Sequence, residues 1–387
     1  MRAYSRADEE SVRDQARVRA WTAAGLLSPE QGTALEAELR TDLRRTHVVL
    51  RGVLAFFTAL IVAAAVGLFF TGLSIESRAI VAVVLWFFGF VSLGIADGLV
   101  TQMRFYRHGI EEALAVCGIA LLTFGTMLLF DDVGSHVDGQ AGLAVAVLGG
   151  IYLYARFGFV YAIVAALPCA AALAFQFGLP DSIARASAAL VLLGAIGATR
   201  ALRPRDAGDY RIGDYAVFQA AAWVFVYLLL NLRVGDVWRD LGLYSSFEGE
   251  RGFYWITYVA VCLMPIAGLT VSIRERDRPL LIANLALALL TLATNKPYLG
   301  WPRQPWDPII LGVLLVTIAL GVRRWLARGP NGTRGGFTAE KLDANLDAIR
   351  YLGTVSVLVK TPTAAPSDHW KGFQGGRSGG GGASGDF

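Results

Sequence analysis

The stretch that decides the fold lies at residues 48–71, VVLRGVLAFFTALIVAAAVGLFFT, in which Arg51 is the only charged side chain. A helix of this length, at about 1.5 Å per residue, crosses a hydrocarbon layer about 30 Å thick. The rest of the chain is similar in kind, since hydrophobic residues make up 55% of the 387 residues and charged residues 17%. A water-soluble domain cannot usually bury so large an apolar share. The sequence therefore predicts a membrane protein without a large extramembrane domain.

Hydropathy divides most of the chain into about ten such stretches and so predicts an all-α fold, a polytopic transmembrane helical bundle of about ten helices. The predicted spans are residues 48–71, 79–100, 113–130, 140–155, 157–177, 183–202, 214–233, 253–273, 279–295 and 308–327. The fourth and ninth are short for a bilayer, so the sequence leaves open whether they cross it fully. The predicted bundle, residues 48–327, lies between a cytoplasmic helical segment at 1–47 and a cytoplasmic tail at 328–387.

Positive charge collects at alternate ends of the predicted spans, and this indicates the orientation because Lys and Arg resist translocation. On this rule the N-terminus and the C-terminus are both cytoplasmic. The arginines that favour this orientation are Arg40, Arg44, Arg45, Arg51, Arg104, Arg107, Arg156, Arg200, Arg203, Arg205, Arg211, Arg274, Arg276, Arg278, Arg323, Arg324 and Arg328. Residues 234–252 fit least well, since arginines and carboxylates are mixed there. Arg outnumbers Lys, as in bacteria with GC-rich genomes, so we expect the bacterial inner (cytoplasmic) membrane. Retained arginines also explain the net charge of +4 without nucleic acid as a partner.

The N-terminal segment is predicted to form a helical hairpin. Val12, Ala16 and Ala20 recur at helical spacing, and Gly25 then offers a left-handed stop. A second helix is expected from the sequence Ser-Pro-Glu-Gln at residues 28–31, which has the pattern of a capping box with Pro at the first helical position. A helix-turn-helix beside arginines could bind DNA, but the apolar faces are thin and no recognition surface stands out. We expect a docking or packing module.

The run from Trp21 to Gln31, WTAAGLLSPEQ, followed by a basic helix and many spans, resembles predicted bacterial membrane proteins grouped as domain-of-unknown-function family 2157. The resemblance covers about the first 70 residues, and beyond them only hydropathy matches. It implies a multi-pass inner-membrane protein and carries over no functional residues, because that family has no assigned activity.

Four polar side chains fall inside predicted spans and form a speculative intramembrane site: Asp97, Asn284, Gln219 and Asn231. An ionisable group in the bilayer is costly and often functional, so Asp97 could be a proton or cation site. The alternative is an interfacial carboxylate paired with Arg51 or Arg104, helped by the close helix approach that Gly94 and Gly98 permit. For the amides we expect hydrogen bonds between helices.

Pro168 and Pro265 fall inside the fifth and eighth spans, where each removes a backbone hydrogen bond and can kink its helix. Five spans in each half, with both termini inside, would also fit an inverted repeat like that of several secondary transporters. The two halves share no matching sequence, which argues against such a repeat.

The sequence carries no signature of catalysis, a cofactor or a metal. Cys117, Cys169 and Cys262 lie in separate spans without a CxxC motif, and the four histidines lack the spacing of two ligands on one helix face. Neither a nucleophile elbow nor a phosphate loop is present. We therefore predict no catalytic residues, no cofactor and no metal, and we expect the protein not to be an enzyme.

The C-terminal tail is predicted to hold one more helix. Thr338 could cap a helix whose apolar face is formed by Leu342, Leu346, Ile349 and Leu352. From about residue 372 the chain is rich in Gly and Ser and is predicted to be disordered.

Two functions fit these features. The first is a membrane scaffold, or an assembly or regulatory component, acting through its cytoplasmic helices on a cytoplasmic or membrane protein partner. The alternative is a small-solute or ion transporter with a site in the bundle near Asp97 and Asn284. Sparse intramembrane charge favours the first. The lipid bilayer is the surrounding partner in both cases, and the sequence leaves the oligomeric state open.

Overall fold

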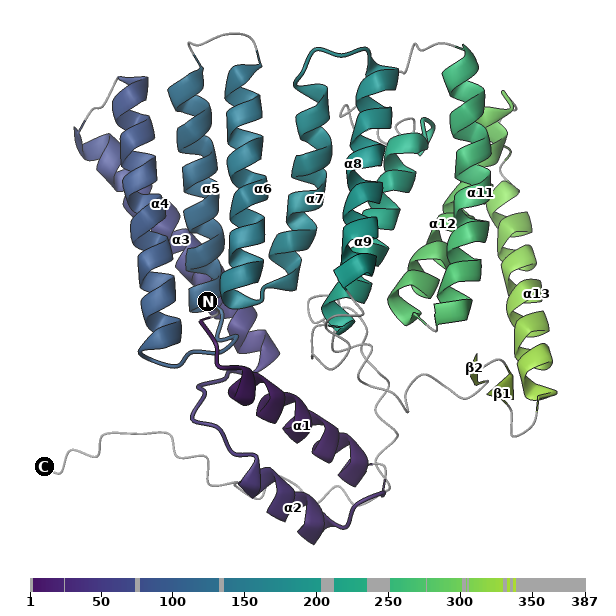
Figure 1. Ribbon diagram of the computed structural model, residues 1–387, viewed down its shortest axis with the longest axis horizontal. Coiled ribbons are helices and arrows are strands. Elements are labelled where there is room, and N and C mark those ends of the chain that lie inside the picture. Colours follow the sequence, from purple (N-terminus) through teal and green to yellow (C-terminus); the bar gives the residue numbers. More distant parts are fainter. Residues whose placement is uncertain are drawn as a thin grey trace, which may run out of the picture. The chain divides into compact units, whose positions relative to one another are not determined.

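The structure is a computed structural model that describes residues 3–23, 25–73, 77–131, 136–202, 212–234, 251–275, 277–300, 304, 306–329, 333–334 and 337–338. Within these residues the chain forms twelve helices and one pair of two-residue strands (Figure 1). The bounds are α1 Arg6–Ala23, α2 Pro29–Glu38, α3 Val48–Leu73, α4 Arg78–Thr101, α5 Ile110–Phe130, α6 Val137–Phe157, α7 Val160–Phe175, α8 Asp181–Leu202, α9 Ile212–Leu230, α11 Arg251–Glu275, α12 Arg278–Tyr298, α13 Asp307–Ala327, β1 Thr333–Arg334 and β2 Phe337–Thr338.

The predicted polytopic helical bundle is confirmed. Eight helices, namely α3, α4, α5, α6, α8, α9, α11 and α12, are long and apolar enough to cross a membrane. Their outward faces carry large apolar side chains, such as Phe56 of α3 and Phe90 of α4. Such faces suit lipid and not water, so the protein is a multi-pass membrane protein.

The lengths of individual spans differ from the prediction. The fourth and ninth spans are not short, because α6 and α12 each run for 21 residues. The short one is α7, whose 16 residues cover only about 24 Å at 1.5 Å per residue. Helix α13 also has 21 residues, although several of its side chains lie outside the described part. Whether α7 and α13 complete a set of ten spans stays a prediction.

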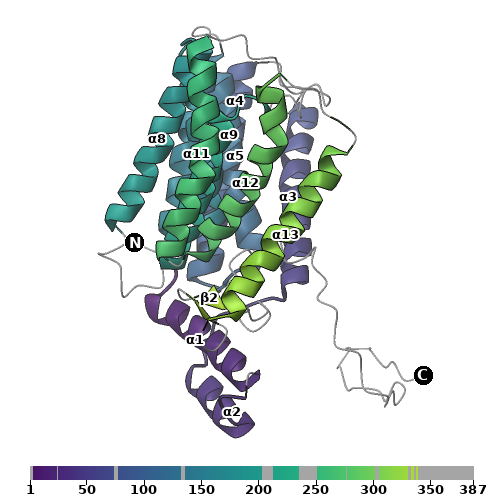
Figure 2. The same cartoon turned by 90° about the vertical axis from the view of Figure 1, so that its right-hand side faces the viewer.

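Neighbouring helices pack in chain order through most of the bundle. Helix α4 packs on α5, α5 on α6, α6 on α7, α7 on α8 and α8 on α9, while α12 contacts both α11 and α9. Figures 1 and 2 show these helices running alternately up and down along a common direction. One apolar cluster is formed by the ends of four helices, α4, α5, α6 and α7. A second cluster joins α7, α8, α9, α11 and α12.

Glycines permit a close contact between α4 and α5. A Cβ at Gly118 would lie 2.9 Å from the Gly89 carbonyl oxygen, and a Cβ at Gly89 would lie 3.1 Å from that of Gly118. Small residues at facing positions let helix backbones approach in a membrane. By contrast, Gly94 and Gly98 of α4 face open space within the described structure.

The predicted N-terminal hairpin is confirmed, together with its capping box. The Ser28 hydroxyl accepts a hydrogen bond from the Gln31 amide at 3.2 Å, and the Gln31 side chain accepts one from the Ser28 amide at 3.0 Å. Gly25 adopts a φ of 73°, the left-handed conformation expected at the turn. In the bundle, Pro168 and Pro265 lie inside α7 and α11, as predicted.

The tail is described only in part. Thr338, the predicted helix cap, lies in β2, which pairs with β1 in antiparallel fashion. The remainder of the predicted amphipathic helix, to Leu352, and the predicted disorder from about residue 372 lie outside the described residues.

The glycine contact between α4 and α5 yields a matched pair of variants. Gly89→Val should lower the melting temperature of the detergent-solubilised protein, since overpacking against backbone costs about 1–3 kcal/mol of the free energy of unfolding. Gly94→Val, on the same helix but facing open space, should leave the melting temperature nearly unchanged. Equal shifts in the two variants, measured by thermal aggregation, would contradict this packing.

Candidate functional site

A line of polar side chains runs along one face of α9 and continues to the residue that follows the helix. Gln219, Trp223, Tyr227 and Asn231 recur at every fourth residue, so they lie on one side of the helix. We call these four residues, with their partners on neighbouring helices, the α9 ladder. Gln219, Tyr227 and Asn231 are each no more than 2% exposed.

The end of the ladder near the C-terminus of α9 is linked to α12. The Asn231 side-chain amide donates hydrogen bonds to the Tyr227 hydroxyl at 2.9 Å and to the Thr294 hydroxyl at 3.1 Å. The hydroxyls of Tyr227 and Thr291 lie 2.8 Å apart and share a further hydrogen bond. These neutral bonds join two membrane helices without placing a charge between them.

Beyond Asn231, aromatic hydroxyls continue the hydrogen bonds to the ends of α11 and α12. The Tyr298 hydroxyl accepts from the Leu232 amide at 2.7 Å. The Tyr254 hydroxyl donates to the Tyr298 carbonyl at 2.9 Å and accepts from the Arg233 guanidinium at 3.0 Å. The chain that leaves α9 is thereby fixed to both neighbouring helices.

The middle of the ladder joins three helices through Asn284 of α12. The Trp223 indole donates to the Asn284 side-chain oxygen at 2.8 Å, and the Asn284 amide nitrogen donates to the Leu280 carbonyl at 2.8 Å. A Cβ at Gly268 of α11 would overlap the Asn284 amide, so the α11 backbone lies directly against it. This agrees with the prediction that Asn284 makes hydrogen bonds between helices.

At the other end of the ladder, Gln219 is only partly satisfied. Its side-chain nitrogen donates to the Thr199 hydroxyl of α8 at 3.2 Å. Its side-chain oxygen is buried and accepts no hydrogen bond from the described residues. A buried amide oxygen without a donor is costly, so this position has the capacity to accept one more polar group.

Asp97 lies apart from the ladder, and the prediction of its partner was wrong. It accepts two hydrogen bonds from the Arg156 guanidinium of α6, at 2.7 Å and 3.0 Å. The two arginines expected beside it are engaged elsewhere, because Arg51 pairs with Glu112 and Arg104 pairs with Asp8 at 2.8 Å. The structure therefore brings together Asn284, Gln219 and Asn231 along α9 and α12 but not Asp97.

Two carboxylates that the sequence reasoning missed lie at the start of α5. The predicted span began at residue 113, which left Glu111 and Glu112 in a loop, whereas α5 begins at Ile110. Both are buried, at 0% and 7% exposed. The adjacent Arg51, one turn inside the first span, was the signal that could have pointed to a buried counter-charge.

These carboxylates belong to a junction where the N-terminal segment meets the bundle. The Ala3 amide donates to the Arg156 carbonyl at 2.7 Å, and the ring of Tyr4 packs edge-on against Tyr106 at 4.9 Å. Burial, and then the nearby carboxylates of Glu111 and Glu112, raise the pKa of the Tyr4 phenol. We call residues 3–8, residues 102–109 and the first turn of α5 the docking junction.

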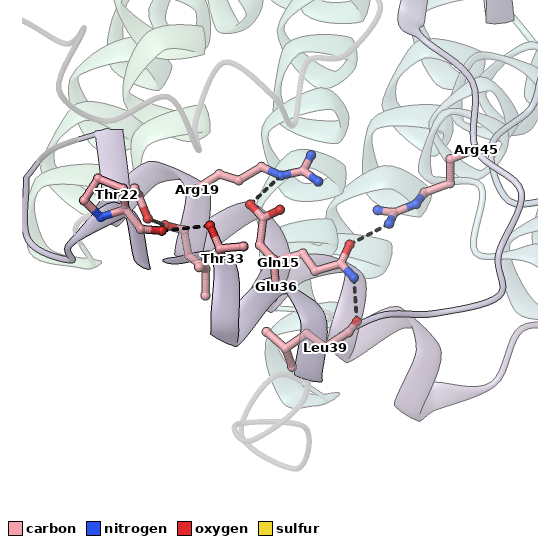
Figure 3. A network of polar contacts seen from close by, with 9 residues as sticks. Gln15, Arg19, Thr22, Thr33, Glu36, Leu39 and Arg45 are labelled. Atoms are coloured by element: carbon pink, nitrogen blue, oxygen red, sulfur yellow. Dashed lines mark hydrogen bonds and ion pairs between the residues drawn. The ribbon is translucent and has the colours of Figure 1, made fainter. Parts of the chain in front are cut away.

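The linker between α2 and α3 makes a second attachment at the docking junction. The Arg44 amide donates to the Arg104 carbonyl at 3.0 Å, and the Tyr106 amide donates to the Arg44 carbonyl at 3.1 Å. Arg45 then reaches back to the hairpin and donates to the Gln15 side-chain oxygen at 2.5 Å (Figure 3). The hairpin is thus held to the bundle by backbone as well as side-chain bonds.

Within the hairpin, α1 and α2 are joined by polar contacts along their length. The Gln15 amide donates to the Leu39 carbonyl at 2.5 Å, and Arg19 pairs with Glu36 at 2.9 Å (Figure 3). Gly32 lies so close to Thr22 that a Cβ would overlap the Thr22 hydroxyl. The two helices therefore form one unit.

Neither region has the ligand set of a metal centre. In the described ranges, no three or more His, Cys, Asp and Glu side chains gather into a group that could hold a metal ion. Cys117, Cys169 and Cys262 are free thiols on α5, α7 and α11. The chemistry that the described side chains offer is charge pairing at the docking junction and neutral hydrogen bonding along the α9 ladder.

In comparisons with known proteins, no family model, no curated protein and no solved structure matches this chain. The resemblance of residues 21–31 to domain-of-unknown-function family 2157 therefore stays a prediction.

Tyr227 offers a direct test of the α9 ladder. Tyr227→Phe removes the hydroxyl that Asn231 and Thr291 share, and should cost about 1 kcal/mol of the free energy of unfolding. Tyr152→Phe on α6 is the control, since its ring is 45% exposed and its hydroxyl bonds to no described residue. Denaturation in mixed micelles would contradict the assignment if the two variants lost equal stability.

Proposed function

We propose that this chain is a bacterial inner-membrane scaffold, or an assembly or regulatory component, that acts through the hairpin α1–α2. The observation that carries the proposal is the combination of firm attachment and apolar exposure. The hairpin is held at the docking junction by backbone bonds and ion pairs, yet Trp21 is 47% exposed and Leu26 is 72% exposed.

These apolar side chains occur in a segment that is otherwise strongly polar. Helix α1 holds charged residues along its length, and Trp21 and Leu26 flank the turn at the end of the hairpin. A Trp in a polar, extramembrane element is the kind of side chain that anchors a protein interface. Leu35 of α2, 36% exposed, adds a third apolar contact on the hairpin.

The state of Asp97 supports a scaffold over a proton-coupled carrier. Its carboxylate makes a bidentate ion pair with Arg156, in which both side chains are only partly exposed. Such a pair occupies both carboxylate oxygens and links α4 to α6. The candidate ion site thus acts as a structural contact close to the hairpin.

The distribution of arginines supports a cytoplasmic location for the hairpin. Arg104 lies in the docking junction, and the Arg156 carbonyl at the end of α6 accepts a hydrogen bond from Ala3 of the junction. Arg200 pairs with Glu275 at corresponding ends of α8 and α11. Under the positive-inside rule these ends face the cytoplasm, and both termini lie on that side.

The test compares two double variants of the full chain in mildly solubilised membranes. Trp21→Ala/Leu26→Ala should reduce co-migration with a protein partner on native gels about tenfold or more, because each truncation removes buried apolar area from the interface. Asp14→Ala/Arg17→Ala removes an exposed ion pair from the same helix and should leave co-migration unchanged. A wild-type chain that migrates alone, or two variants that lose the partner equally, would refute the proposal.

A second candidate, transport of a small solute or ion, is supported by the α9 ladder. Neutral polar groups recur along one face of α9, and a buried oxygen of Gln219 accepts no described donor, so this face offers hydrogen-bonding groups of the kind that a polar solute requires. In proteoliposomes with a potassium gradient and an enclosed pH dye, transport of potassium or protons would appear as a flux that Asn231→Leu lowers and Tyr152→Phe does not. If neither potassium nor protons cross the membrane in this assay, the result counts against this candidate.

A further inference from the structure

Two adjacent carboxylates at the start of α5 differ in the partners that they contact. Glu112 is matched by Arg51, whose Nε donates to Oε2 at 2.6 Å and whose terminal nitrogen contacts Oε1. Arg51 is held in place by its backbone as well. Gly109, with a φ of 105°, lies so close to the Arg51 carbonyl that a Cβ would overlap it. Arg51 therefore donates hydrogen bonds from two guanidinium nitrogens, one to each carboxylate oxygen of Glu112.

Among the described residues, no such counter-charge contacts Glu111 directly. Its Oε1 accepts a hydrogen bond from the His108 amide at 2.7 Å. Its Oε2 is buried and bonds to no described atom, while the whole residue is 0% exposed. A buried carboxyl with one free oxygen is favoured in its neutral, protonated form, because the charged form would lose its hydration without gaining a counter-charge or a donor to that oxygen.

The N-terminal segment closes off this position from water. Tyr4 is 6% exposed and lies in the apolar cluster that includes Leu114 and Ala115, one turn beyond Glu111. Its hydroxyl is buried and makes no hydrogen bond with the described residues. Tyr4 also lies close enough to Glu111 for their charges to interact. Burial of Glu111 thus depends on docking of the N-terminal segment.

The charged and titratable groups around Glu111 come from the docking junction and from the helices α3 and α7. Within electrostatic reach of Glu111 are Tyr4 of the N-terminal segment, Arg51 of α3, Glu112 of α5 and Tyr161 of α7. The His108 amide donates a hydrogen bond to Glu111, and Arg107 of the same loop lies within electrostatic reach of Tyr4 and Glu112. The neighbouring pairs Arg104–Asp8 and Arg156–Asp97 are each internally neutral. Because Arg51 is committed to Glu112, a charged Glu111 would add an unmatched negative charge.

We propose that the Glu111 carboxyl binds a proton while residues 3–8 are docked, and that release of this proton to water undocks the segment together with the hairpin α1–α2. The docked state then holds one more proton than the undocked state. Docking consequently weakens as pH rises above the value at which an exposed Glu ionises, by up to about tenfold per pH unit. This switch does not depend on the proposed scaffold function, because it concerns attachment of the hairpin and not what the hairpin binds.

The first measurement detects the proton itself. Infrared spectra of the full chain in nanodiscs should show the C=O stretch of a protonated carboxylic acid at neutral pH. That band should be absent in Glu111→Gln and present in Tyr4→Phe, which preserves the buried ring. A band that persists in Glu111→Gln, or no band in the wild type, would overturn the proposal.

The second measurement follows docking by hydrogen exchange of peptides from residues 3–9 and 102–109, corrected for intrinsic rates, from about pH 5 to about pH 9. Wild-type protection should fall as pH rises, whereas Glu111→Gln, which is always neutral, should stay protected throughout. Equal pH dependence in the two proteins would assign the transition to another group and overturn the proposal.

Two further variants separate the proton from competing explanations. Tyr4→Phe should retain the wild-type pH dependence. If the Tyr4 hydroxyl instead bonds an ionised Glu111, this variant would undock at every pH, which would overturn the proposal. Glu112→Gln leaves Arg51 unmatched and should lower protection at every pH, and a Glu112→Gln protein that behaved like Glu111→Gln would also overturn it.

Discussion

An arginine one turn inside a membrane helix needs an oppositely charged side chain in contact with it, because an unpaired charge at that depth is costly. Arg51 of α3 meets this requirement through Glu112 of α5, in a pair whose side chains are 22% and 10% exposed. The contact ties the first span to the third and presses Gly109 against the Arg51 backbone. The loop from Gln102 to Gly109 is then positioned to receive the Arg44 backbone and Tyr4. Much of the attachment between hairpin and bundle therefore depends on this one pair.

The two halves of the described bundle solve the problem of polarity in different ways. Around the docking junction, arginines and carboxylates are paired near the ends of helices, where water and headgroups can share the cost of the charge. In the second half, α9 and α12 are joined by amides, hydroxyls and an indole, which need partners but carry no charge. Asn284 and Asn231 each make two hydrogen bonds of this kind. One goes to a partner on the neighbouring helix, and the other goes to a residue four positions earlier in the chain. Neutral bonds hold deep segments together, whereas ion pairs are confined to the ends.

Hydropathy predicted every described helix of the bundle, and the Ser28 capping box predicted the hairpin turn, because both signals are local in sequence. The partner of Asp97 could not be predicted in this way. Arg51 and Arg104 are nearer along the chain, and only the fold brings Arg156 of α6, 59 residues away, to the carboxylate. Glu111 and Glu112 were missed for a related reason. A hydropathy window excludes charged residues from a span, although a paired carboxylate can occupy the first turn of a membrane helix. The four-residue spacing on α9 was visible in the sequence, but it acquires meaning only from the threonines of α12 that face it.

Charged groups gather at the docking junction and neutral polar groups along the α9 ladder, and this difference determines which region can respond to the surroundings. A ladder whose hydrogen bonds are mostly complete resists change, because breaking any one of them leaves a buried group without a partner. The docking junction is different, since it combines matched pairs with one carboxyl oxygen of Glu111 and the hydroxyl of Tyr4, which make no hydrogen bond with the described residues. Those groups make the junction sensitive to protonation and to contacts of the hairpin, while the matched pairs preserve its geometry. Regulation is therefore expected where the N-terminal segment meets the bundle, and rigidity where α9 meets α12.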